Sequence, residues 1–132
     1  MALESRHLSV WIDRPAADAY AFAVDPRNLP AWAPGLTSHV DEVDGQWFID
    51  MGGERAGFAF AEPNPFGVLD HRVTMPSGEV FDNPMRVIPA ADGCEVFFTV
   101  RRQPGVSDEE FARDTGLVQA DLERLKGLLE AR

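Results

Sequence analysis

The chain has 132 residues, a length typical of one domain with its own hydrophobic core, so we expect a single domain over residues 1–132. Its 12 Lys and Arg residues against 22 Asp and Glu residues give a net charge of −10, which disfavours binding to nucleic acid or to anionic membranes. No run approaches the roughly 20 apolar residues of a membrane span, no signal peptide is evident, and Cys94 alone cannot form an internal disulfide, so we expect a cytoplasmic protein without membrane insertion.

The first predicted elements are a strand and two short helices. Residues 6–13 alternate between apolar and polar side chains, which predicts a strand. Pro15 in a first helical turn, and Pro26 after a capping Asp25, each indicate the start of a helix. Helices this short cannot cover the sheet that follows. We therefore expect them to close one end of it, with Trp32 near the mouth of the enclosed space.

Further strands follow, joined mostly by tight turns. Asp44-Gly45 is typical of a two-residue hairpin turn, and residues 76–78 and Asp92-Gly93 indicate two more turns. The predicted strands cover residues 37–43, 46–51, 55–61, 68–75, 79–89 and 94–102. With the first strand they make seven, which predicts an antiparallel sheet built from hairpins.

Pairing across the last two turns predicts the face that each residue occupies. One face is apolar and includes His71 opposite Asn83. The other face carries one charged row, made of Arg72, Asp82 and Arg101. Both hairpins give the same division, which supports the register, because a slip by one residue would invert a strand. Pro84 conflicts with a continuous central strand, since proline cannot donate to the ladder.

After Ser107 the pattern changes to a helical period. Ser107 and Glu110 form a capping box. One apolar stripe follows, made of Phe111, Thr115, Val118, Leu122, Leu125 and Leu129. A long helix with such a stripe needs an apolar partner, and the apolar face of the sheet is the large one that the sequence offers.

This order of a strand, two short helices, six strands and a long helix resembles the helix-grip fold of the START-like (SRPBCC) superfamily. The resemblance is carried by IDRPAADAYAFAVDPRNLPAWAPG at residues 12–35 and by the helix DEEFARDTGLVQADLERLKGLLE, and it is greatest for the polyketide cyclase/dehydratase-like branch. It implies an α+β fold in which a curved seven-stranded antiparallel sheet wraps around the C-terminal helix and leaves an apolar cavity. Members include carriers, cyclases and regulators, so the fold implies a ligand cavity without fixing a reaction.

His71 is the strongest candidate for chemistry. On an apolar face beside Asn83, it could orient a carbonyl or a phenol, or transfer a proton near neutral pH. The alternative is a buried histidine that only satisfies itself, through Asn83 or the backbone. His39 opposite Asp50 is interpreted as an exposed pair, and Cys94 as a packed thiol rather than a nucleophile.

The residues expected to line the cavity are inner-face side chains of the sheet and of the long helix. They are Trp32, Trp47, Ile49, Phe58, Phe60, His71, Phe81, Asn83, Met85, Phe98, Phe111, Val118 and Leu122. No metal-ligand spacing, nucleophile motif or phosphate-binding loop is present in the sequence, so we expect no metal site and no cofactor.

The sequence therefore favours a protein, monomeric or homodimeric, that binds or carries a small hydrophobic molecule, either lipid-like or aromatic and polyketide-like. One alternative is a metal-free cyclase or dehydratase that uses His71 for proton transfer. Binding is favoured over it because Asn83, the neighbour of His71, cannot transfer a proton at neutral pH. The other alternative is an interaction domain whose cavity is filled by its own side chains.

Overall fold

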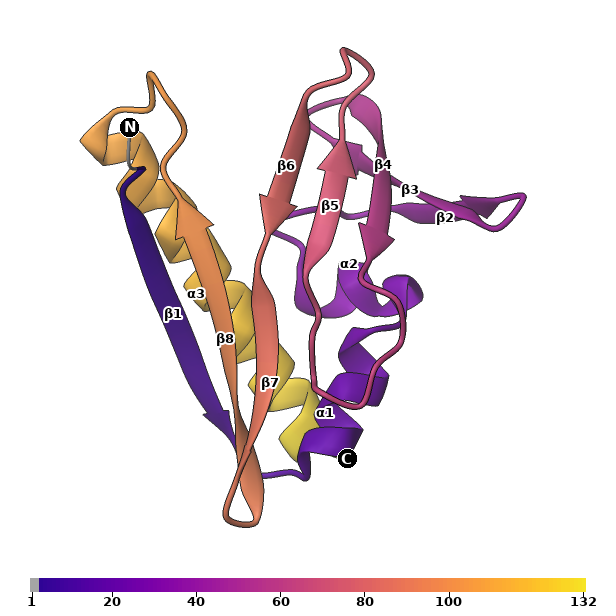
Figure 1. Cartoon of the computed structure of the whole chain (residues 1–132), viewed down its shortest axis with the longest axis vertical. Coiled ribbons are helices and arrows are strands. Elements are labelled where there is room, and N and C mark those ends of the chain that lie inside the picture. Colours follow the sequence, from indigo (N-terminus) through magenta and orange to yellow (C-terminus); the bar gives the residue numbers. More distant parts are fainter. Residues whose placement is uncertain (1–2) are drawn as a thin grey trace.

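The computed structural model describes residues 3–132 of the chain. Its elements follow the order that the sequence predicts: one strand, short helices, a run of strands and a long helix (Figure 1). In chain order they are β1 (Ser5–Ile12), α1 (Ala16–Ala23), the 3-10 helix η1 (Pro26–Asn28), α2 (Leu29–Trp32), β2 (Val40–Val43), β3 (Gln46–Met51), β4 (Glu54–Phe60), β5 (His71–Thr74), β6 (Val80–Asn83), β7 (Met85–Ala90), β8 (Gly93–Arg101) and α3 (Asp108–Glu130).

The strands form two sheets, so the prediction of one seven-stranded sheet is wrong. Within residues 3–132, β1-β8-β7 make a three-stranded sheet and β2-β3-β4-β5-β6 a five-stranded one. The predicted strand 79–89 is divided at Pro84, which has no N–H to donate. Its first half pairs with β5, and its second half pairs with β8 from Met85 onward.

The hairpin registers on either side of Pro84 are confirmed. His71 lies opposite Asn83 in the β5–β6 ladder, and Arg72 donates to Asp82 at 2.8 Å across it. Arg101 does not join this pair. It would lie opposite Asp82 only if the β7–β8 ladder continued into β6, and that ladder ends at Met85 and Phe98. The predicted row of three charges is therefore a pair.

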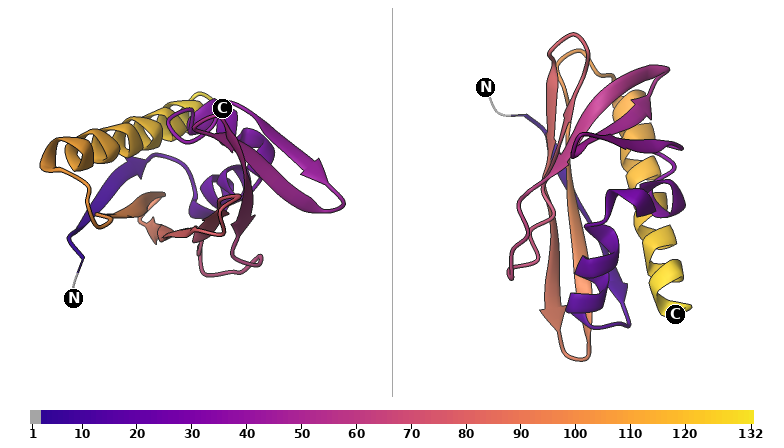
Figure 2. Two further views of the ribbon diagram at one scale, coloured as in Figure 1. Left: turned by 90° about the horizontal axis from the view of Figure 1, so that it is seen from above. Right: turned by 90° about the vertical axis from the view of Figure 1, so that its right-hand side faces the viewer.

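Backbone hydrogen bonds join the two sheets where the segment before β5 runs beside β7. Val87 N donates to Gly67 O, and Leu69 N donates to Met85 O, both at 2.9 Å. Together the two sheets make a curved surface along one side of α3, with α1 and α2 between them at one end (Figure 2). This is the expected grip, made from two sheets.

The predicted capping box begins α3. Ser107 Oγ accepts from Glu110 N and donates to Glu110 Oε1, each at 3.1 Å. The side of the helix that faces the sheets is buried at Phe111, Thr115, Asp121, Leu122, Leu125 and Leu129. No helix of the described part of the chain is both long and apolar enough to cross a membrane.

Candidate functional site

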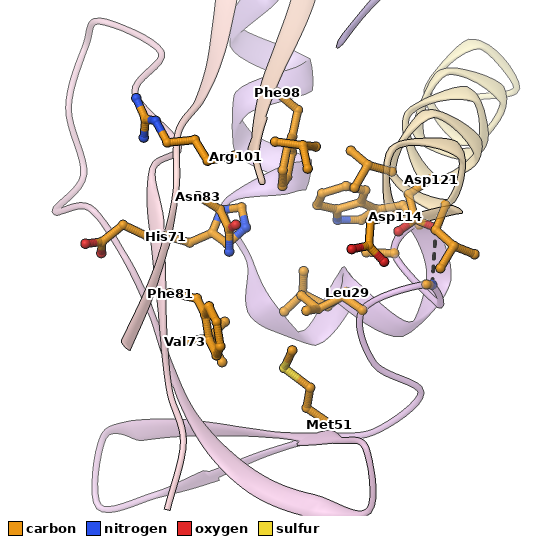
Figure 3. Close-up of a pocket in the computed structure, with 18 of the residues that line it drawn as sticks. Leu29, Met51, His71, Val73, Phe81, Asn83, Phe98, Arg101, Asp114 and Asp121 are labelled. Atoms are coloured by element: carbon orange, nitrogen blue, oxygen red, sulfur yellow. Dashed lines mark hydrogen bonds between the residues drawn. The ribbon is translucent and has the colours of Figure 1, made fainter. Parts of the chain in front are cut away.

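A cavity of about 290 Å³ lies between α2, α3 and the strands β5, β6 and β8 (Figure 3). This volume is at the lower end of the range for ligand pockets, about 300–1,000 Å³. Its interior is lined by buried side chains, among them Leu29 on the floor and Val73 and His71 on the sheet wall. Its rim is exposed and includes Leu117 and Gln103. The cavity is therefore apolar inside and opens to solvent.

Part of the predicted set lines this cavity. These residues are Trp32, His71, Phe81, Asn83, Phe98 and Val118. The expectation that Trp32 lies near the mouth is wrong, because its side chain is only 2% exposed. As the last residue of α2, it points inward and forms part of the floor, while Gly35 of the following turn is exposed at the rim.

The other predicted positions lie outside this cavity. The buried core holds Ile49, Phe58, Met85 and Leu122, with Trp47 and Phe60 packed against it. Phe111 is buried beneath the guanidinium groups of Arg6 and Arg102. The space that these positions were expected to share is filled in part by α1, whose Ala19 and Ala23 are fully buried.

His71 sits in an aromatic enclosure on the sheet wall. Its ring stacks on Phe58 at 5.3 Å between centroids and meets the edges of Phe60 and Phe98 at 5.5 and 5.4 Å. Nδ1 lies 3.0 Å from Leu69 O, which can only accept, so Nδ1 carries the proton. Burial lowers the pKa of His71 and favours the neutral ring. Neutral His71 therefore presents Nε2 as a hydrogen-bond acceptor.

This burial predicts a pH dependence of stability. The unfolded chain protonates histidine near pH 6.5, whereas folded His71 resists protonation until a lower pH. Unfolding therefore takes up a proton in that window, so the free energy of unfolding should fall as the pH drops below about 6.5. Urea unfolding between pH 8 and 5 measures this loss in the wild type and in His71→Phe, which should lack it.

His39→Gln is the matched control for that experiment. The side chain of His39 is exposed, as predicted, and its nearest carboxylate is that of Asp41, 3.9 Å away. Its variant should keep the pH dependence of the wild type. Equal slopes in the wild type and in His71→Phe would contradict the neutral, buried state of His71.

Asp121 is a polar residue of the cavity that sequence reasoning missed. It is 6% exposed, and its Oδ1 accepts from Gly35 N at 3.2 Å (Figure 3). The same Oδ1 also accepts from Arg124 Nη1 at 3.0 Å. Burial raises the pKa of this carboxyl. A Cβ on residue 35 would lie 2.9 Å from Oδ2, so a larger residue there would require the carboxylate to move. The sequence could have indicated this residue, because Asp121 follows Val118 by three positions and therefore lies on the same side of the helix as the apolar stripe.

Charged groups line both the interior and the rim of the cavity. Asp114 and Asp121 lie on the α3 wall, facing His71 across the cavity (Figure 3). Arg101 is the one basic side chain among the described residues that line the cavity, and Asp82 is already bound to Arg72. Asp121 is likewise bound to Arg124, so the charges of Asp114 and Arg101 balance and the lining has no excess of positive charge to attract an anionic ligand.

A second hollow of about 410 Å³ lies between α1 and the end of α3. Its wall includes Arg14, whose guanidinium donates to Leu129 O, Arg132 O and Asp18. Asp18 and two backbone carbonyls of this hollow thus already accept from Arg14. Leu129 is the one fully buried apolar side chain among the described residues that line it, so we do not assign this hollow to a ligand.

Comparison with known proteins supports the fold. XoxI from Bacillus cereus is 15% identical with a TM-score of 0.73, over 98% of this chain and 96% of that one. Ara h 8.0201 is 13% identical with a TM-score of 0.71, over 99% and 100%. Norcoclaurine synthase from Thalictrum flavum, in complex with dopamine and hydroxybenzaldehyde, is 16% identical with a TM-score of 0.64, over 99% and 88%.

At these identities the solved structures show the fold alone. No curated protein matches the sequence. The family described as polyketide cyclase / dehydrase and lipid transport matches residues 6–130, nearly the whole chain. This match confirms the resemblance to the START-like superfamily, and the chain belongs to the polyketide cyclase / dehydrase and lipid transport family.

Proposed function

We propose that this protein binds a small, neutral, apolar molecule, aromatic rather than fatty-acid-like, in the cavity between α3 and the sheets. The observation that carries the proposal is a cavity of about 290 Å³ whose floor is buried and apolar and whose rim is open. Its small volume favours a compact ring system over a long acyl chain. The lining has no excess of positive charge for a fatty-acid carboxylate, and the net charge of −10 of the whole chain disfavours an anion.

The family relationship and one solved structure support the same proposal. The family includes lipid transport, and norcoclaurine synthase, which shares the fold, is described with two small aromatic molecules. Cys94 is buried as a free thiol, and burial raises its pKa, which suits a packed residue in a reducing cytoplasm. We therefore propose a cytoplasmic binding or carrier protein.

The proposal predicts that a neutral fluorescent probe, N-phenyl-1-naphthylamine, binds the native protein. Val118→Trp should weaken binding at least about fivefold, because overfilling an apolar site costs about 1–3 kcal/mol. Val118 is half-buried and lines the cavity from α3. Fluorescence titration measures the dissociation constant. The anionic probe 1-anilinonaphthalene-8-sulfonate should bind more weakly than the neutral one.

Leu128→Trp is the matched control for this titration. It introduces the same side chain on the same helix at a position that is 36% exposed and outside the cavity. Its affinity for the neutral probe should equal that of the wild type. An affinity that is unchanged in Val118→Trp, or equally reduced in both variants, would contradict binding in this cavity.

A second candidate function is proton-transfer catalysis of the cyclase or dehydratase type. It is favoured by the pair of titratable groups on opposite walls, because the environment lowers the pKa of His71 and raises that of Asp121. Titratable groups whose pKa values are shifted by burial and that face one cavity are a common feature of catalytic sites. Catalysis would appear as turnover of a poly-β-ketone thioester that His71→Phe abolishes while probe binding persists.

A further inference from the structure

One wall of the cavity is a seam between the two sheets, where β6 and β8 border the same space without pairing. Within residues 3–132 no ladder joins these two strands, and they diverge beyond the end of β7 (Figure 1). Asp82 and Asn83 of β6 and Val100 and Arg101 of β8 nevertheless line the cavity together. These four residues define the seam, which is an unpaired part of the cavity wall.

The last hydrogen bond before the seam sets the register in which the two strands can pair. Thr99 N donates to Pro84 O at 3.0 Å, one position beyond the last pair of the β7–β8 ladder. Hydrogen-bonded pairs recur at every second residue of an antiparallel ladder, so the next such pair in this register is Asp82 with Arg101. Pro84 has no N–H to donate in return. The connection is therefore weakest where the strands separate.

The backbone groups of this next pair are directed into the seam. Arg102 N donates to Glu4 O, so the alternation along β8 turns Arg101 away from β1. In the β5–β6 ladder the same alternation turns Asp82 away from β5. Gln103 Nε2 donates to Arg101 O at 3.5 Å, a long and therefore weak bond. Free N–H and C=O groups at a sheet edge are a template for pairing with a further strand.

The side chains at the seam favour the same pairing. Arg101 is exposed and has no ion-pair partner among the residues that the structure describes. The exposed carboxylate of Asp82 binds Arg72 Nε at 2.8 Å and has acceptor capacity left for a second arginine. Pairing of the strands would bring Arg101 next to this carboxylate, so the charges attract the two edges toward each other.

We propose that the seam is a gate of the cavity: in a second, closed conformation β6 and β8 pair at Asp82 and Arg101, and in the open one they separate and admit the ligand. Only the role as an entrance rests on the proposed function. The closed conformation follows from the register and from the free edges. Because Pro84 interrupts the ladder beside the seam, the strands exchange between the two conformations without breaking the β7–β8 ladder.

A disulfide across the seam tests the closed conformation. In the register of the last bond, residues 83 and 100 would lie directly opposite as a non-hydrogen-bonded pair. Their Cα atoms would then be about 4.5 Å apart, which suits a disulfide. Mild oxidation of the double variant Asn83→Cys/Val100→Cys should therefore crosslink it, as measured by mass spectrometry of unreduced peptides. Cys94 is fully buried and does not compete.

Two further cysteine pairs serve as controls for the oxidation. Ser9→Cys/Phe97→Cys joins residues that are already opposite in the β1–β8 ladder, so it should crosslink readily. Arg72→Cys/Arg101→Cys joins β5 to β8, which β6 separates in the closed conformation, so it should not crosslink. A seam pair that crosslinks no faster than this second control would overturn the closed conformation.

Stopped-flow mixing with N-phenyl-1-naphthylamine tests the role as an entrance. The crosslinked seam variant should take up the probe at least about tenfold more slowly than the same variant after reduction, because the gate cannot open. A crosslink without slower uptake would overturn the gate. Failure of the wild type to bind the probe would overturn the proposed function instead, while the crosslink would still decide whether the seam closes.

Discussion

Replacing Leu125 with alanine is expected to lower the free energy of unfolding by about 2–5 kcal/mol, the usual loss when a buried leucine is truncated. Leu125 is fully buried on the side of α3 that faces the sheets. Truncation removes apolar contacts and leaves a void that the rigid curved sheets cannot close. Urea unfolding monitored by circular dichroism measures the change.

Leu128→Ala gives the matched comparison within the same helix. Leu128 is 36% exposed, so its truncation makes the same change in helix propensity while removing much less buried surface. We expect a loss below about 1 kcal/mol, close to that of other surface substitutions. Equal losses at the two positions would show that α3 is not gripped by the sheets through its apolar stripe.

The second large effect is expected at Gly67, where the two sheets are joined. Gly67 has φ +72°, and a Cβ there would collide with the carbonyl oxygen of Val87, the residue whose N–H it binds. Gly67→Ala should therefore cost about 2–5 kcal/mol, combining about 1–2 for left-handed backbone with about 1–3 for overpacking. Thermal and urea unfolding of the purified variant measure this loss.

Gly53→Ala separates the two contributions. Gly53 has a similar φ, +83°, but nothing lies within 4 Å of a Cβ built there. We expect it to lose only the backbone contribution of about 1–2 kcal/mol. A Gly67→Ala loss no greater than that of Gly53→Ala would show that the junction between the sheets can separate without cost.

The hairpins were predictable because their information is local. Asp44-Gly45 sets a tight turn, with φ +52° and +80°, and alternation on either side then assigns each face. Within β5 and β6 the same reasoning places His71 opposite Asn83, as observed. The capping box at Ser107 likewise lies within one turn of the helix that it begins.

Features that depend on distant parts of the chain were not predictable in this way. Pro84 was recognised as a conflict, but its outcome depends on the segment before β5, which approaches β7 and joins the sheets. Asp121 is buried because Gly35, far away in sequence, comes close enough to donate to it. Phe66 is 79% exposed in the loop between β4 and β5, although its side chain is large and apolar. Alternation and helical periodicity describe one element at a time, so they do not predict contacts between segments that are distant in sequence.

The predicted lining of the cavity was too large for a related reason. Alternation identifies the inner face of a sheet but does not say which part of that face another element covers. α1 packs against β7 and covers the part near Met85, whereas the region between α2, α3 and β5 stays open. His71 and Phe98 remain in the open region, whereas Ile49 becomes core.

The most direct test of the account is to locate a bound ligand by intermolecular nuclear Overhauser effects between N-phenyl-1-naphthylamine and protein methyl groups. Binding between α3 and the sheets predicts effects to Leu29, Val73 and Val118, all of which line the cavity. Effects confined to exposed apolar residues such as Val43 or Leu128, which lie outside it, would contradict the central claim.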